Sequence, residues 1–176
     1  MQSAVLENGT ATDASSGRTP PDAQQLAAQN GSSPGVFWAT KNQKIDQTSF
    51  TLLAILTQVV DRIGPRSDLS PSQYGTKIHT EFATAVRGEG IADVEVEQTF
   101  GLDPDDTYGA EGSIRTDVLL RDESGNIIAI WDVKTGNARL KPWRVRELRQ
   151  MTDTTSDTYV FEMNADRGVV LKNRRE

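Results

Sequence analysis

Hydrophobic residues recur at the spacing of an α-helix in two successive segments of this chain. Between residues 47 and 63 the apolar positions repeat every three or four residues and predict an amphipathic helix, which ends at Gly64. A second helix is predicted over 71–87. It begins at Ser70 and Pro71, because serine caps a helix start and proline suits the first turn. Its apolar stripe consists of Tyr74, Ile78, Phe82, Ala85 and Val86.

The apolar spacing changes to that of β-strands after this helix. Strands are predicted at 92–100, 114–121, 127–134, 158–163 and 168–172, with a loop over 103–113 and a helix over 141–152. The strand at 127–134 is apolar on both faces, with Ile127, Ala129, Trp131 and Val133 on one and Ile128 and Ile130 on the other. That pattern indicates a central strand covered from both sides. We therefore expect an α/β fold with a mixed β-sheet flanked by helices.

The strands before and after residues 123–126 form a predicted hairpin. A four-residue turn pairs Asp122 with Ile127, and in that register Asp117 stands directly opposite Asp132. Their Cβ atoms would be about 4.5–5.5 Å apart, where two like charges are destabilising unless another charge compensates them. A shift of the register by one residue would separate the two aspartates.

Composition divides the chain and removes several kinds of site. Residues 1–35 have almost no large apolar side chains and predict a flexible or disordered arm, followed by a helical extension over 36–70 and a core domain over 71–176. No segment predicts a signal peptide or a membrane span. The chain has no cysteine and one histidine, His79, which argues against thiolate chemistry and catalytic zinc. A carboxylate site for Mg²⁺ or Mn²⁺ remains.

Charge is distributed unevenly along the chain. Residues 1–133 hold 9 basic and 19 acidic side chains, whereas residues 134–176 hold 10 basic and 6 acidic ones. A basic strip on an acidic body can bind phosphates. The predicted nucleic-acid contacts are Arg139, Lys141, Arg144, Arg146 and Arg149. Trp143, in the same strip, is either a packing residue or a platform on which a base stacks.

Asp117, Asp132 and Lys134 form the candidate catalytic site. Asp132 and Lys134 are two residues apart on a strand and share a face. Two carboxylates can hold Mg²⁺, which polarises a phosphoryl oxygen and lowers the pKa of a bound water. Lys134 would serve that water or the charge of the transition state. Glu81, at the edge of its helix's apolar stripe, is a candidate third catalytic and metal-binding carboxylate, and His79 is an exposed polar residue or a general base.

These motifs resemble the core of the PD-(D/E)XK nucleases. Asp117 matches the first aspartate and Asp132-Val133-Lys134 the (D/E)-X-K, with Thr116 in place of the proline that names the motif. The YGTKIH helix start at 74–79 and the DVKTG…RVRELR run at 132–149 are similar to nuclease domains at the C-termini of bacterial polymorphic toxins, including Rhs-type and type VI secretion effectors.

The resemblance covers about residues 74–152, under half of the chain. It implies a restriction-endonuclease-like fold, magnesium-dependent cleavage of DNA and a cognate immunity protein. It also implies a secreted antibacterial effector that acts in the cytoplasm of a target bacterium. Two alternatives stay open: an RNase (tRNase) toxin of the same fold, and a non-catalytic module that docks on an acidic protein through the helix over 141–152. The chain is either a free-standing effector or the C-terminal domain of a larger toxin.

Overall fold

The computed structural model describes residues 40–101, 112–165 and 170–173. The predicted arm at 1–35 and most of the predicted loop at 103–113 lie outside these ranges. The described elements are α2 (Gln43–Ile63), α3 (Pro71–Glu89), β1 (Val94–Val96), β2 (Thr99–Phe100), β3 (Ile114–Arg115), β4 (Val118–Arg121), β5 (Ile127–Lys134), α4 (Pro142–Met151), β6 (Tyr159–Asn164) and β7 (Val170–Asn173).

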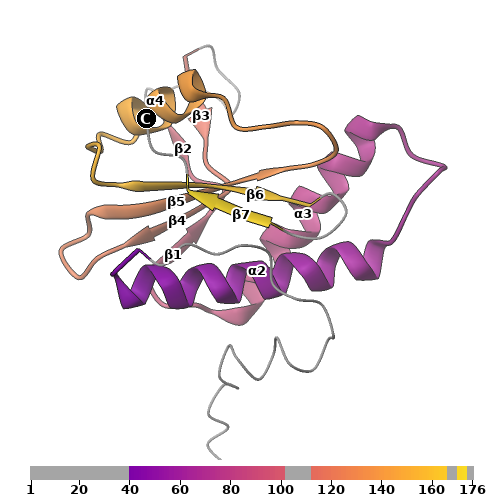
Figure 1. The fold of residues 1–176 in the computed structure, drawn as a ribbon, viewed down its shortest axis with the longest axis horizontal. Helices are drawn as coiled ribbons and strands as arrows, with labels where there is room; N and C mark the ends of the chain where they lie inside the picture. Colours follow the sequence, from indigo (N-terminus) through magenta and orange to yellow (C-terminus); the bar gives the residue numbers. More distant parts are fainter. Residues whose placement is uncertain (1–39, 102–111, 166–169, 174–176) are drawn as a thin grey trace, which may run out of the picture.

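Five of the strands form one mixed sheet in the order β1-β4-β5-β6-β7. Neighbouring strands are antiparallel except β5 and β6, which run parallel because the chain crosses between them through α4. Helix α4 covers one face of the sheet, and α2 and α3 cover the other (Figure 1). The predicted α/β fold with a mixed sheet flanked by helices is confirmed.

Side-chain caps set where the two long helices begin. The Asn42 side chain accepts a hydrogen bond from the Ile45 amide, so α2 starts at Gln43, before the predicted residue 47. Ser70 and Gln73 form a reciprocal capping box at the start of α3, as the sequence signal predicts. Both helices bury their apolar faces in the same core against the sheet. None of the helices in the described ranges is long and apolar enough to cross a bilayer.

Strand β5 is buried on both faces, as predicted. Trp131 lies on the side of α2 and α3, where its ring stacks on Phe161 at 5.5 Å and its Nε1 donates to Ser49 Oγ at 3.1 Å. Ile130 packs on the other side, against α4. The start of the strand departs from the predicted alternation. Ile127 joins the α4 side and Ile128 the opposite side, because the pairing shifts by one residue after Leu120.

Two predicted strands are each broken in two. The segment 92–100 becomes β1 and β2, and the segment 114–121 becomes β3 and β4; β2 and β3 pair with each other in a separate two-stranded sheet. Glu97, with φ 56°, turns the chain between β1 and β2. The Glu97 amide donates to the Asp117 carbonyl, and the Thr116 amide donates to the Gln98 carbonyl. These hydrogen bonds join the two chain segments at which the predicted strands are interrupted.

Replacing Ser49 by alanine should lower the free energy of unfolding by about 1–3 kcal/mol, because it leaves the buried Trp131 Nε1 without its acceptor. Urea denaturation measures this loss. Gln47→Ala, at an exposed position of the same helix, is the control and should stay within about 0.5 kcal/mol of the parent. Equal stabilities for the two variants would contradict the importance of this hydrogen bond.

Candidate active site

Asp117 lies at the break between β3 and β4, half-buried. Backbone pairing of β4 with β5 ends at Val118 and Trp131. The amide of Val133, two residues after Trp131, donates to Asp117 Oδ2 at 2.7 Å. The carboxylate thus takes the place of a backbone acceptor that the departing strand no longer provides.

The predicted hairpin register is confirmed along the body of the strands. The observed pairs are Leu120 with Ala129, Leu119 with Ile130 and Val118 with Trp131. It is wrong at the turn, where Arg121 rather than Asp122 pairs with Ile127. Asp117 precedes β4 and is not a ladder partner of Asp132. Its side chain nevertheless accepts a hydrogen bond from the amide of Val133, the residue after Asp132. This bond brings Asp117 close to Asp132 without strand pairing.

Asp132 is buried near the end of β5, with 6% of its surface exposed, and forms an ion pair with Lys134. Burial raises the pKa of Asp132, and the charge of Asp117 raises it further. The positive charges of Lys134 and Arg144 oppose this shift without cancelling it. A further positive charge at Asp132 would therefore favour its ionised form.

His79 contacts Asp117 from helix α3. Its Nδ1 lies 3.1 Å from Asp117 Oδ1, and 29% of its side chain is exposed. Desolvation lowers the pKa of His79, but the hydrogen bond and the charge of Asp117 outweigh it and leave the pKa raised.

Close packing of α3 brings His79 to the site. A Cβ on Gly75 would lie 2.8 Å from Thr135 Oγ1, so the helix touches the residue that follows β5. Gly75 and Ala83, four residues on either side of His79, are both buried. These small residues are the sequence signal for a close helix face, and they could have distinguished His79 from an exposed polar residue.

Glu81 does not join this group. Its carboxylate pairs with Arg62 at 3.1 Å and with Lys77 at 3.7 Å, and 40% of the side chain is exposed. Residues two apart on a helix point in very different directions, so Glu81 points away from the site because His79 points toward it. No three His, Asp or Glu residues in the described part of the chain form a ready-made metal cluster. The expectation of a third carboxylate from Glu81 is therefore corrected.

Four of the five basic residues predicted to contact nucleic acid lie at or near the surface. Arg139, Lys141 and Arg146 are exposed. Arg144 turns inward from α4: its Nη2 donates to the Arg115 carbonyl at 3.2 Å and its Nη1 to Glu147 at 2.6 Å. The charge of Arg144 opposes the rise in the pKa of Asp132, so this arginine belongs to the electrostatic surroundings of the site.

Arg149, the fifth, is buried with 8% of its surface exposed, and its Nη2 donates to the Thr158 carbonyl at 3.0 Å. It lies on the same face of α4 as Val145 and Leu148, which are also buried. Arg149 ties α4 to the start of β6, and the expectation that it contacts phosphate is corrected.

Strand β6 adds two buried polar residues that the sequence analysis missed. Glu162 stands beside Asp132 in the parallel register and is fully buried; its Oε2 accepts from the Leu140 amide at 2.9 Å. Asn164 Nδ2 donates to the Ala138 carbonyl at 3.3 Å. The two side chains hold the loop that links β5 to α4. A carboxylate inside an otherwise apolar strand was the available signal.

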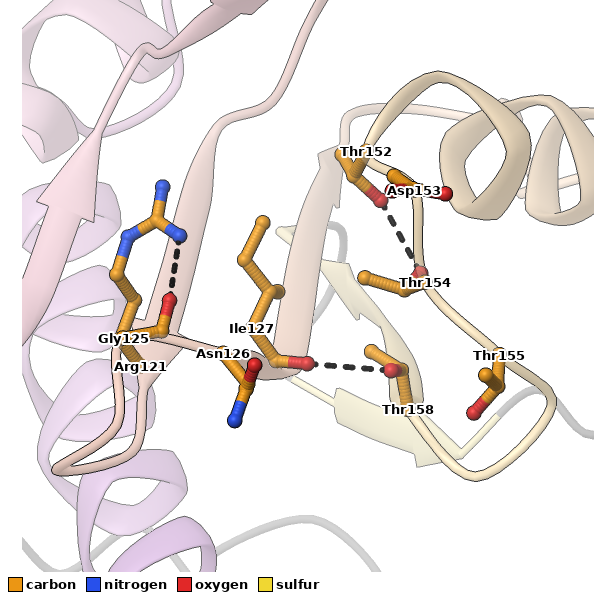
Figure 2. A pocket seen from close by; sticks show the side chains of 9 residues that line it. All are labelled: Arg121, Gly125, Asn126, Ile127, Thr152, Asp153, Thr154, Thr155 and Thr158. Carbon is orange, nitrogen blue, oxygen red and sulfur yellow. Dashed lines mark hydrogen bonds between the residues drawn. The ribbon is translucent and has the colours of Figure 1, made fainter.

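Two cavities lie at opposite ends of β5. One of about 420 Å³ opens at its start, where Figure 2 shows the residues that line it: Arg121, Gly125, Asn126, Ile127, Thr152, Asp153, Thr154, Thr155 and Thr158. Thr158 Oγ1 donates there to the Ile127 carbonyl at 3.2 Å, so this hydroxyl holds the strand ends together. The other, of about 720 Å³, lies beyond the end of β5, with Tyr74, Thr135 and Asn137 in its lining. Only the second adjoins the candidate site.

Asp117 and Asp132 fit a divalent cation. Both are carboxylates, the ligand type that Mg²⁺ and Mn²⁺ prefer. Burial, and after it the charge of Asp117, raises the pKa of Asp132, and such an ion would favour the ionised form of this carboxyl. Comparison with protein-family models and with curated proteins finds no match to this chain.

The pKa of His79 should lie above its ordinary value near 6.5 and should fall when Asp117 is replaced by asparagine. His79 is the single histidine of the chain, so one set of imidazole proton signals reports its titration by NMR. Because folding raises this pKa, the stabilisation is complete below about pH 6.5 and is lost as the pH rises through the folded pKa. Asp157→Asn, at an exposed position, is the control. An unchanged titration in Asp117→Asn would contradict the contact.

Proposed function

We propose that this chain is a metal-dependent endonuclease of the PD-(D/E)XK type that hydrolyses phosphodiester bonds of DNA. The observation that carries the proposal is the convergence of Asp117, Asp132 and Lys134 at the end of a doubly buried strand. A buried carboxyl with a raised pKa beside a second carboxylate and a lysine is typical of functional sites. The mixed sheet flanked by helices agrees with the fold that the motif resemblance implies.

Each residue of the site has a role in this proposal. Asp117 and Asp132 hold the cation, Mg²⁺ or Mn²⁺, which when bound polarises a phosphoryl oxygen and lowers the pKa of a water. The Lys134 ammonium, which lies against Asp132, orients the attacking water or stabilises charge on the phosphate. His79 and the Val133 amide each engage one oxygen of Asp117 and so fix the orientation of its carboxylate.

The substrate backbone follows the basic residues next to the site. Arg139, Lys141 and Arg146 are exposed and bind phosphates, while Arg144 adds positive charge close to Asp132. DNA is the substrate that the toxin resemblance favours. RNA has the same phosphates and is the second candidate.

The same resemblance supports a biological role as an antibacterial effector. In that role the domain is secreted by a type VI or related system and cleaves nucleic acid in the cytoplasm of a target bacterium. The producing cell then needs an immunity protein, and an acidic surface on that protein would complement the basic strip.

Purified wild-type protein should degrade plasmid DNA in the presence of Mg²⁺. Asp132→Asn and Lys134→Ala should lower the rate at least about a hundredfold, because each removes a group that acts on the reacting phosphate or water. Gel electrophoresis of the plasmid over time measures the rate, and circular dichroism checks that each variant is folded.

Two substitutions serve as controls. Asp157→Asn removes an exposed carboxylate remote from the site, and Glu81→Gln tests the corrected position of that residue; both should cleave within about fivefold of wild type. Full cleavage by folded Asp132→Asn would overturn the proposal. Cleavage of total RNA but not of plasmid would instead assign an RNA substrate.

Mg²⁺ should bind wild-type protein and raise its Tm, while Asp117→Asn and Asp132→Asn should lose most of this binding. Isothermal calorimetry and thermal melts measure the two effects. Because folding raises the pKa of Asp132, stability falls as the pH rises through that pKa, and Asp132→Asn should be more stable than metal-free wild type at neutral pH. Absence of Mg²⁺ and Mn²⁺ binding, together with no cleavage, would favour the non-catalytic binding module.

A further inference from the structure

Trp143 is the only large hydrophobic side chain that stands exposed in the described part of the chain, with 59% of its surface accessible. It lies in the first turn of α4, on the side away from the core. The opposite side of the helix is buried through Val145, Leu148 and Arg149. Packing of the domain therefore does not explain the tryptophan.

Cations surround this ring. Arg146, one helical turn after Trp143, shares its face of α4, and Arg139 and Lys141 precede the helix; all three are exposed. We call Arg139, Lys141, Trp143 and Arg146 the basic face. An exposed aromatic ring among cations is the combination by which proteins hold single-stranded nucleic acids, since the cations follow the phosphates and the ring stacks on a base.

The basic face borders the candidate active site. Arg144, the residue after Trp143, turns inward and donates to the Arg115 carbonyl in β3, directly before the break that carries Asp117. The loop that leads from Lys134 to α4 carries Arg139 and is held by Glu162. The helix and the loop that carry the basic face are therefore both anchored to the segments that lead to Asp117 and from Lys134.

We propose that Trp143 stacks on an unpaired base, so that the preferred substrate of this site is single-stranded or locally opened nucleic acid. This inference rests on the proposed nuclease function. In an intact duplex both faces of each base are covered by neighbouring pairs, so the ring has nothing to stack on. Tryptophan and arginine are also enriched at protein interfaces, so the test below includes a protein partner among its outcomes.

The test compares Trp143→Leu with Trp143→Phe, both in the cleavage-deficient Asp132→Asn protein. Fluorescence anisotropy measures binding to a labelled single strand of about twelve nucleotides and to the corresponding duplex. Trp143→Leu should weaken single-strand binding about tenfold and duplex binding less than about twofold, while Trp143→Phe retains most of the single-strand affinity.

Two further substitutions separate stacking from charge. Arg146→Ala should weaken single-strand and duplex binding alike. It should also reduce the slope of log affinity against log salt concentration by about 1, the amount expected for one lost phosphate contact. Gln150→Ala, at an exposed position one heptad after Trp143, should change neither.

Equal single-strand affinities for Trp143→Leu and its parent would overturn the proposal, as would equal losses for single strand and duplex. A dimer that sedimentation shows to dissociate in Trp143→Leu, with nucleic-acid binding unchanged, would assign the ring to a second copy of the chain. Unchanged nucleic-acid binding with lost affinity for an acidic protein partner would assign it to that protein. Plasmid cleavage by the wild-type protein tests the nuclease function separately, so either proposal can fail while the other is judged.

Discussion

The hydrogen bond from the Val133 amide to the Asp117 carboxylate is the contact on which the arrangement of this domain depends. Strand β4 begins only at Val118, and a buried amide left without an acceptor costs about 1–3 kcal/mol. The carboxylate supplies that acceptor, so the preceding chain can leave the main sheet and pair as β3 with β2. Strand β5 stays intact up to Lys134. The place where the chain leaves the sheet is also the place where the acidic groups meet.

The fold carries charge at the end of a strand that is otherwise apolar. Asp132 and Glu162 are both buried side by side on β5 and β6, although burial of a carboxylate disfavours its charged form. A buried oxygen of Glu162 accepts a hydrogen bond from the Leu140 amide and so holds the neighbouring loop. Although Lys134 lies beside Asp132, burial raises the pKa of this carboxyl above its ordinary value. Buried charges that lower the stability of the fold are common in sites that bind a ligand.

Much of this arrangement could be predicted from local sequence patterns. The helices, the doubly buried β5 and the hairpin register follow from apolar spacing and turn length. The strand breaks could not be predicted. Apolar residues at every second position indicate a strand, but they do not show that the strand changes its pairing partner at Glu97 or Asp117. His79 and Glu81 flank the same apolar stripe, and only packing around Gly75 decides which of them faces the sheet. The burial of Arg149 depends on a carbonyl of the distant β6 end.

Helix α4 has one face buried in the core and one face exposed to solvent. Val145, Leu148 and Arg149 are held by the core, whereas Trp143 and Arg146 meet only solvent at their outer surface. Exchanging the outer residues leaves the carboxylates and the sheet undisturbed. Substitutions at the outer positions should therefore cost little stability, whereas substitutions on the inner face of the helix disturb the core.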